Sequence, residues 1–288
     1  MEHHDTENHD RGLAFDLSTL IGRRRLFALA GAGAGAALLA ACASGGSSGG
    51  ATSSTRSTGS TGSTASMSST ESSTAATSDA SCAPIPEETA GPYPGDGSNG
   101  PDVLAESGIV RSDIRSSIGS ASGVADGVPL TVELTVTDTA NGCVPLTGAA
   151  VYLWHCDREG RYSMYSQGAE SENYLRGVQE TDADGRVTFT SIFPACYSGR
   201  WPHIHFEVYA GVAEATGGGE PIATSQLAFP ADVCTVAYAT AGYEQSVSNL
   251  AQVSLDTDMV FADGVSQQLA SMSGDTEAGY TAALAVPI

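Results

Sequence analysis

Hydrophobic and polar residues alternate along several short segments in the second half of the chain. In the run 131–137, Val132, Leu134 and Val136 share one face, which is the two-residue period of a half-buried strand. Alternation or a short apolar run predicts five further strands, at 149–156, 186–192, 203–209, 222–229 and 280–286. Turns rich in Gly, Pro and Asp separate them, and only 233–243 and 249–253 suggest short helical turns. We therefore predict an all-β fold, a β-sandwich of mainly antiparallel strands with long loops and few short helices.

The N-terminal region has the pattern of an export signal. Residues 23–42 read RRRLFALAGAGAGAALLAAC, in which three arginines precede an uncharged run of sixteen residues. This run is shorter than the roughly 20 apolar residues that span a bilayer, although an uncleaved anchor remains an alternative. Arg24 and Arg25 look like a twin-arginine signal, and Leu-Ala-Ala-Cys resembles a lipobox that would make Cys42 the lipidated first residue.

Three regions follow from these patterns. Residues 1–42 form the twin-arginine or lipoprotein-type signal, and its His3, His4 and His9 are removed with it. Residues 43–81 are nearly all Ser, Thr, Gly and Ala and are predicted to be a disordered tether. Residues 82–288 form the folded domain. We expect an exported protein, a cell-surface or membrane-anchored lipoprotein or otherwise a secreted or periplasmic one, which meets the membrane only through Cys42.

Charge narrows the choice of partner. The chain has 33 acidic residues against 12 arginines and no lysine, a net charge of −21. Nucleic acid is excluded as a partner, because phosphate binding requires clustered Lys and Arg. A like-charged partner would be repelled, so a small or weakly charged substrate is expected.

The cysteines predict at least one disulfide. Removing Cys42 leaves five, Cys82, Cys143, Cys156, Cys196 and Cys234, and an exported protein is expected to oxidise some of them. Five is an odd number, so at least one thiol stays unpaired or pairs between chains. Cys196–Cys234 is our first choice of pair. No two are spaced C-x-x-C, which disfavours a cysteine metal site.

The segment 193–205 carries the candidate chemistry. His203 and His205 lie two residues apart on a predicted strand, so both imidazoles face the same way and can hold one metal ion. Paired histidines are also common without a metal. Tyr197 lies six residues earlier in a loop with Gly and Pro, and Tyr162 follows another strand. Either tyrosine could be an ordinary core or rim residue. Together, two phenols and two imidazoles favour hard Fe(III) over zinc.

An ordered series of motifs supports this reading. The motifs lie at 88–93, 145–149, 151–157, 160–163, 182–189 and 194–205. They resemble those of the intradiol ring-cleavage dioxygenases, the family of protocatechuate 3,4-dioxygenase and catechol 1,2-dioxygenase. The resemblance covers roughly residues 82–288, and it is closest to an exported, lipoprotein-like branch.

The resemblance implies a site and a reaction. Residue by residue, it implies that Tyr162, Tyr197, His203 and His205 hold non-haem Fe(III), and that Arg200 flanks the substrate and stabilises its negative charge. It also implies that Tyr197 leaves the iron and accepts a substrate proton. The reaction would cleave a catechol-type small aromatic diol with O₂, between its two hydroxylated carbons, to a cis,cis-muconate-type product.

A different class of function is also compatible with the sequence. The chain could be a surface-tethered β-sandwich binding module without catalysis, which recognises carbohydrate or protein through Trp154 and Trp201. Colour would separate the two hypotheses, because a tyrosinate bound to Fe(III) absorbs visible light and a binding module is colourless.

Overall fold

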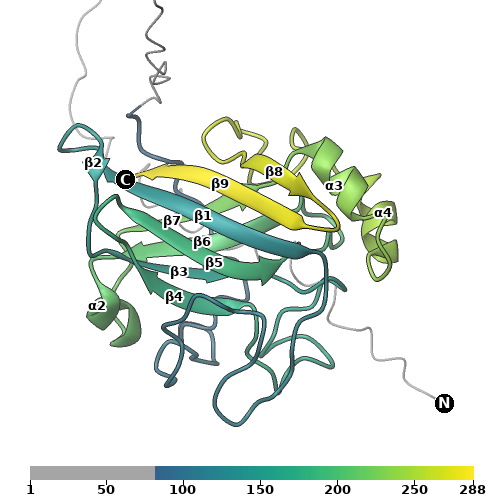
Figure 1. Ribbon diagram of the computed structural model, residues 1–288, viewed down its shortest axis with the longest axis horizontal. Helices are drawn as coiled ribbons and strands as arrows, with labels where there is room; N and C mark the ends of the chain where they lie inside the picture. Colours follow the sequence, from purple (N-terminus) through teal and green to yellow (C-terminus); the bar gives the residue numbers. More distant parts are fainter. Residues whose placement is uncertain (1–81) are drawn as a thin grey trace, which may run out of the picture. The chain divides into compact units, whose positions relative to one another are not determined.

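The computed structural model describes residues 82–288, which form a sandwich of two β-sheets (Figure 1). The five-stranded sheet contains β1 (Pro129–Asp138), β2 (Val144–Pro145), β5 (Arg186–Ile192), β8 (Ser271–Asp275) and β9 (Gly279–Pro287). The four-stranded sheet has the order β4 (Arg176–Glu180), β3 (Ala150–Trp154), β6 (His203–Tyr209) and β7 (Ala223–Ala228). The short helices are α2 (Val212–Thr216), α3 (Ala231–Ala237) and α4 (Glu244–Leu250). The predicted all-β sandwich is confirmed.

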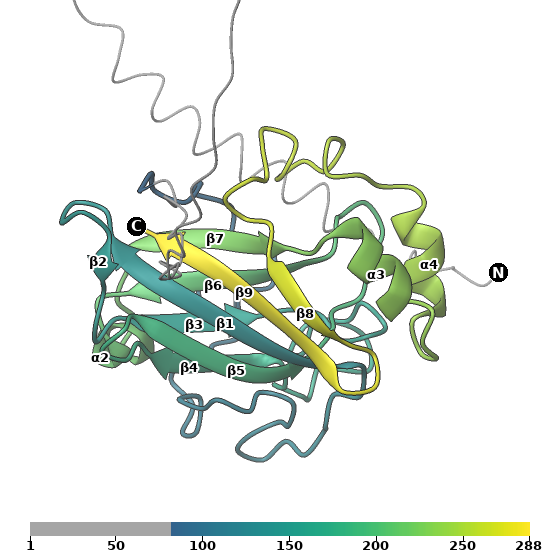
Figure 2. The same cartoon turned by 45° about the horizontal axis from the view of Figure 1, so that its top comes forward.

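Strand β1 shows why these residues form a sandwich. Its side chains alternate, and Leu130, Val132, Leu134 and Val136 are all buried. On one side β1 pairs antiparallel with β5 and β2, and on the other it pairs parallel with β9, whereas all other strand pairs are antiparallel. Figure 2 shows β1 and β9 crossing in front of the four-stranded sheet, and the apolar faces of the two sheets meet between them.

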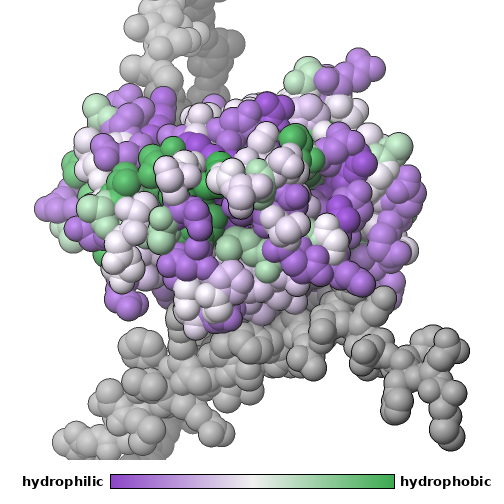
Figure 3. All heavy atoms as spheres, turned by 90° about the horizontal axis from the view of Figure 1, so that it is seen from below, coloured by the Kyte–Doolittle hydropathy of each residue, from purple (hydrophilic) through white to green (hydrophobic). Residues whose placement is uncertain are grey.

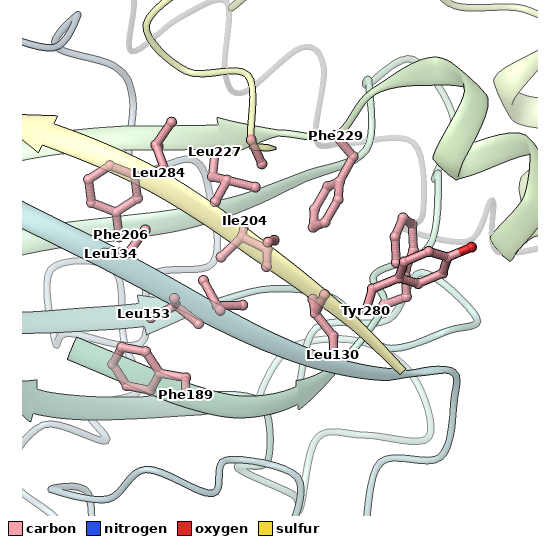
Figure 4. Close-up of a cluster of buried hydrophobic side chains, with 14 of the residues drawn as sticks. Leu130, Leu134, Leu153, Phe189, Ile204, Phe206, Leu227, Phe229, Tyr280 and Leu284 are labelled. Atoms are coloured by element: carbon pink, nitrogen blue, oxygen red, sulfur yellow. The ribbon is translucent and has the colours of Figure 1, made fainter. Parts of the chain in front are cut away.

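Figure 4 shows this core, in which leucine, isoleucine and phenylalanine side chains from both sheets interdigitate. Leu153 on β3 and Ile204 and Phe206 on β6 supply the four-stranded sheet's side, and Phe189 and Leu284 come from the opposite sheet. These residues are buried, and they give the second sheet a fixed position against the first.

The outer face of the four-stranded sheet is also covered. Strands β3, β6 and β7 are buried at every position, so neither of their faces meets solvent. A second apolar cluster lies on this outer face, and it combines Tyr152 and Trp154 with buried side chains such as Val103 and Ile109 from the long loops before β1. Seen from the side on which these loops lie, the surface is mostly polar with scattered hydrophobic patches (Figure 3). The loops therefore enclose a second interior, separate from the core between the sheets.

One disulfide is present among the described residues. It joins Cys82 to Cys143 with Cα atoms 5.8 Å apart, and so ties the start of the domain to the turn after β1. The expectation of at least one disulfide is confirmed, but the choice of Cys196–Cys234 is wrong. Cys156, Cys196 and Cys234 are buried thiols, and Cys196 instead directs its Sγ to the carbonyl oxygen of Arg200 at 3.5 Å.

The predicted signal in residues 1–42 and the predicted tether in 43–81 lie outside the described residues. Within residues 82–288, no helix is both long and apolar enough to cross a membrane.

Candidate metal centre

Strand β6 places the two candidate histidines in the second interior. Ile204, Phe206 and Val208 point into the core between the sheets, so His203 and His205 point to the outer face. Both histidines are 2% exposed, and their Nε2 atoms lie 3.1 Å apart. The strand period thus brings the two imidazoles together, as the sequence predicts.

Both candidate tyrosines lie beside these histidines. The Tyr197 hydroxyl is 3.2 Å from Nε2 of His203, and the Tyr197 ring is half-buried. The ring centroid of Tyr162 is 5.9 Å from that of Tyr197 and 6.2 Å from that of His205. The structure therefore gathers all four side chains, from the loop after β3, the loop before β6 and β6 itself.

A glycine permits the close approach of the two tyrosine loops. Gly160 adopts a φ of +85°, and a Cβ atom placed there would lie 3.2 Å from Cβ of Tyr197. Another residue at this position would be strained and would crowd Tyr197. The glycine of the Gly160-Arg161-Tyr162 motif is thus required because it lets the chain just before Tyr162 pack closely against Tyr197.

The histidine rings are fixed by groups behind them. Nδ1–H of His203 donates to the carbonyl oxygen of Trp201 at 2.5 Å, which leaves Nε2 as an acceptor facing the other candidate residues. The ring of His205 stacks on Trp154, with centroids 5.0 Å apart and planes inclined by 4°. Burial, with the nearby charge of Arg200 as a further cause, holds the pKa of each histidine well below its ordinary value. Both imidazoles are therefore neutral, as metal ligands must be.

Tyr162 is the most enclosed member of the group. Its hydroxyl oxygen is buried and makes no hydrogen bond of normal geometry, and the same holds for Nδ1 of His205. Burial, followed by the neighbouring Tyr197, raises the pKa of Tyr162 well above its usual range. A buried hydroxyl without a partner costs about 1–3 kcal/mol. The site therefore contains buried polar atoms that the protein leaves without a hydrogen bond of normal geometry.

These four side chains fit a bound cation. Separations of 3.1 and 3.2 Å between donor atoms are those of adjacent corners around a metal whose bonds are about 2.1 Å long. A cation would also pair with the buried hydroxyl of Tyr162 and favour its ionised form. Within residues 82–288 no three His, Cys, Asp or Glu side chains form a metal-binding cluster. The donor set here consists of phenols and imidazoles.

Arg200 is buried beside this group and is held on two edges. It is 1% exposed, its Nε–H donates to Oδ2 of Asp258 at 3.0 Å, and its Nη2 donates to Oε1 of Gln226 at 2.7 Å. Gln226 lies on β7 directly opposite His205 in the ladder. The arginine predicted from the sequence is thus at the site, with its charge compensated by a carboxylate.

The N-terminal segment of the domain completes this surrounding layer. Gln226 donates to the carbonyl oxygen of Thr89 at 2.9 Å, and Gln268 lies 3.4 Å from the Glu88 carboxylate. Burial is the main cause that raises the pKa of Glu88 to about 7, and Asp263 adds to it. Sequence reasoning included Glu88 in a motif without giving it a role. It missed Asp258 and Gln226, and no local pattern marks either residue.

Comparison with known proteins agrees with the fold and shows the family. The model of the dioxygenase family (Dioxygenase_C) matches residues 99–262, which is more than half of the chain. The chain therefore belongs to this family, the intradiol ring-cleavage dioxygenases. The intradiol ring-cleavage dioxygenase from Tetranychus urticae is a similar solved structure, with a TM-score of 0.54 and 26% identity, covering 72% of this chain and 96% of that one.

Similarity to curated relatives is confined to a short segment. Catechol 1,2-dioxygenase 1 of Acinetobacter lwoffii is 41% identical over 54 residues, which are 18% of this chain and 17% of that protein. Chlorocatechol 1,2-dioxygenase of Rhodococcus opacus is 38% identical over 53 residues, 18% of this chain and 21% of that protein. The chain thus spans about a fifth of the length of the curated relatives it matches.

Proposed function

We propose that the chain is a non-haem Fe(III) dioxygenase that cleaves a catechol-type ring between its two hydroxylated carbons. O₂ is the second substrate, and the product is of the cis,cis-muconate type. The observation that carries this proposal is the convergence of two phenols and two neutral imidazoles in one buried place. The catechol and chlorocatechol dioxygenases among the relatives support an aromatic diol as the substrate class.

Tyr162, Tyr197, His203 and His205 would hold the iron. Phenolate oxygen is a hard ligand that suits a ferric ion, and both imidazoles are kept neutral by burial. When bound, Fe(III) supplies a Lewis acid that binds the deprotonated diol and prepares the ring for attack by O₂. The protein's part is to orient the diol, exclude water and move its protons.

Tyr197 is the better placed of the two tyrosines to accept a proton. It is half-buried in the loop before β6, and its hydroxyl lies 3.2 Å from Nε2 of His203, at the long end of the hydrogen-bond range. Held as a phenolate by the iron, Tyr197 would be able to accept a hydroxyl proton of the substrate on its Oη and leave the metal as a neutral phenol. Tyr162 is 2% exposed and packed among side chains of the second interior, so it is expected to stay in place.

Arg200 supplies fixed positive charge next to the diol. Its guanidinium is held by Asp258 and Gln226 before any substrate arrives, so no reorganisation is needed when negative charge develops on the ring. Such preorganised charge in a site closed to water is often the largest contribution to catalysis. The covering loops, which bring the Tyr93 ring within 5.0 Å of the Tyr162 ring, help to exclude water.

The alternative of a binding module is not supported by its proposed contact residues. Trp154 is 0% exposed and Trp201 is 5% exposed, so neither side chain is available to an outside partner. Trp154 instead stacks on His205, and Nε1–H of Trp201 donates to the carbonyl oxygen of Phe229 at 2.8 Å. Both side chains are thus used inside the domain, Trp154 against the site and Trp201 in a neighbouring apolar cluster.

Metal content, colour and product together test the proposal. Freshly purified protein is expected to contain about one iron per chain, to absorb visible light and to convert catechol to cis,cis-muconate with both ¹⁸O atoms of labelled O₂. Arg186→Gln, an exposed substitution on β5, is the control that should leave all three properties unchanged. Stoichiometric zinc in a colourless protein would overturn the iron assignment. A semialdehyde product would overturn the cleavage position.

We further propose that the protein is exported and anchored through Cys42. The Cys82–Cys143 disulfide supports an oxidising compartment, where such bonds persist. Replacing Arg24 and Arg25 with lysine should leave the full-length precursor inside the cell, and Cys42→Ala should abolish labelling by a fatty-acid analogue. An unchanged distribution in the first variant would rule out the twin-arginine route.

A further inference from the structure

The fully buried carboxylate of Asp258 binds the loop before β6, which contains Tyr197 and Arg200. Asp258 is 0% exposed, and its Oδ2 accepts hydrogen bonds from Nε of Arg200 at 3.0 Å and from the backbone N–H of Trp201 at 2.6 Å. Its Oδ1 accepts from the N–H groups of Val260 and Phe261, at 2.9 and 3.2 Å. Each carboxylate oxygen thus accepts two hydrogen bonds. Oδ2 binds the loop before β6, and Oδ1 binds the backbone that directly follows Asp258.

The first link fixes the position of Arg200. Its Nε edge is bound to Asp258 and its Nη2 to Gln226, so the guanidinium is held from two directions. A buried guanidinium requires a compensating charge, because taking an unpaired ion out of water costs far more than a hydrogen bond returns. Asp258 supplies this charge, and its direction of approach decides which way Arg200 faces.

The second link reaches His203 through one residue. Asp258 holds the N–H of Trp201, and the carbonyl oxygen of Trp201 accepts Nδ1–H of His203 at 2.5 Å. The position of that carbonyl sets both the tautomer and the ring orientation of His203. A single carboxylate is therefore connected to the arginine and to one of the histidines of the site.

We propose that Asp258 is a positioning residue, which sets the placement of Arg200 directly and the orientation of His203 through the Trp201 backbone. It touches neither substrate nor metal. The proposal rests on the proposed function, since it concerns the reaction in which Arg200 and His203 take part. Asn in its place would present an NH₂ group to two of the four donors, so at least two hydrogen bonds would be lost.

Kinetics of iron-loaded protein provide the first test. Asp258→Asn is expected to lower kcat/KM for catechol by about 10- to 100-fold, the usual cost of removing a group behind a metal site. In the Arg200→Met background the same substitution should cost less than about 3-fold, because much of its effect passes through Arg200. Val286→Ala, in the core of the opposite sheet, is the matched control for lost stability and should change kcat/KM less than about 2-fold.

Histidine NMR of the metal-free protein provides a readout that needs no activity. In ¹⁵N-labelled wild type, His203 should be the neutral tautomer with the proton on Nδ1, and Asp258→Asn should shift or broaden that signal while Val286→Ala leaves it unchanged. If Asp258→Asn does not fold, the double variant with Arg200→Met, which buries no unpaired charge, is compared with Arg200→Met alone.

Two results would overturn the proposal. One is an unchanged His203 signal together with unchanged kcat/KM in Asp258→Asn. The other is a loss in the double variant that equals the product of the two single losses. If wild type neither binds iron nor cleaves catechol, the proposed function fails, and the His203 signal alone decides the role of Asp258.

Discussion

Replacing Tyr162 with phenylalanine removes a hydroxyl group that is buried without a normal hydrogen bond in the metal-free protein. The ring, which packs in the second interior, is kept. Because the desolvated hydroxyl costs about 1–3 kcal/mol, its removal should stabilise the metal-free domain by up to that amount. For a domain of this size, each kcal/mol corresponds to roughly 2–4 °C in Tm. We therefore expect the Tm of metal-free Tyr162→Phe to equal or exceed that of wild type.

The same substitution should have the opposite effect once iron is present. Iron stabilises the wild type in proportion to its affinity for the folded state. Tyr162→Phe removes one of the four proposed ligands, so the iron content and the metal-induced rise in Tm should both fall. If Tyr162 is a metal ligand, Tyr162→Phe should raise or preserve the Tm of the metal-free protein and lower the Tm of the iron-loaded protein. If Tyr162 is purely structural, the substitution should change both Tm values in the same direction.

Tyr152→Phe is the matched control. Tyr152 is also fully buried, but its hydroxyl donates to the carbonyl oxygen of Pro94 at 2.5 Å and accepts from Nη1 of Arg176 at 3.1 Å. Its loss should destabilise both forms by about 1–3 kcal/mol and leave the metal-induced rise intact. The assay is calorimetry of metal-free and iron-loaded protein. If metal-free Tyr162→Phe were less stable than wild type by more than 1 kcal/mol, the reasoning from an unpaired hydroxyl would be refuted.

Three further predictions follow from the same contacts. Tyr197→Phe should retain much of the iron but shift the visible band and slow turnover roughly 10²- to 10⁴-fold, the range for a positioned acid–base group; full activity with an unchanged spectrum would remove Tyr197 from the site. Since the folded pKa of Glu88 is raised to about 7 from 4.5, its contribution to stability is complete below pH 4.5 and is lost as the pH rises through 7. Glu88→Gln should therefore unfold less readily than wild type at pH 8, by on the order of 2 kcal/mol in urea titrations, and equal stability at that pH would contradict the raised pKa. Cys82→Ser should lower stability by about 4 kcal/mol, as the loss of a disulfide with a sequence separation of 61 implies, and denatured wild-type domain should titrate only the thiols of the unpaired cysteines.

Whether a strand could be predicted from the sequence depends on how much of it is buried, and therefore largely on whether it lies in the centre or at the edge of its sheet. The central strands β1, β3, β6 and β9 were predicted, because burial on one or both faces imposes alternation or an apolar run. The missed strands β2, β4 and β8 are all at sheet edges. β8 is mostly exposed and reads SMSGD, so no apolar pattern marks it. The sequence also predicts two edge strands, β5, whose burial alternates, and β7, which is buried at every position.

In the candidate site, local sequence patterns mark some residues, whereas others reach the site only through the fold. His203 and His205 could be placed together because the strand period is local, and the tyrosines followed from motifs close to strands. Asp258 reaches Arg200 across a sequence separation of 58, through a fold that no local pattern reveals. The disulfide shows the same limit, since cysteine spacing carries no information on connectivity.

Strand β6 explains why the site needs its covering loops. One face of the strand is held in the apolar core, so the histidines of the other face would lie on an open sheet surface if no loops covered it. In water their pKa values would be ordinary and Arg200 would be screened by solvent. Loops that enclose this face keep the imidazoles neutral, but they also bury Arg200, whose charge then requires Asp258. The carboxylate is thus a physical consequence of closing the site, and variants that open the loops should weaken the dependence of the site on Asp258.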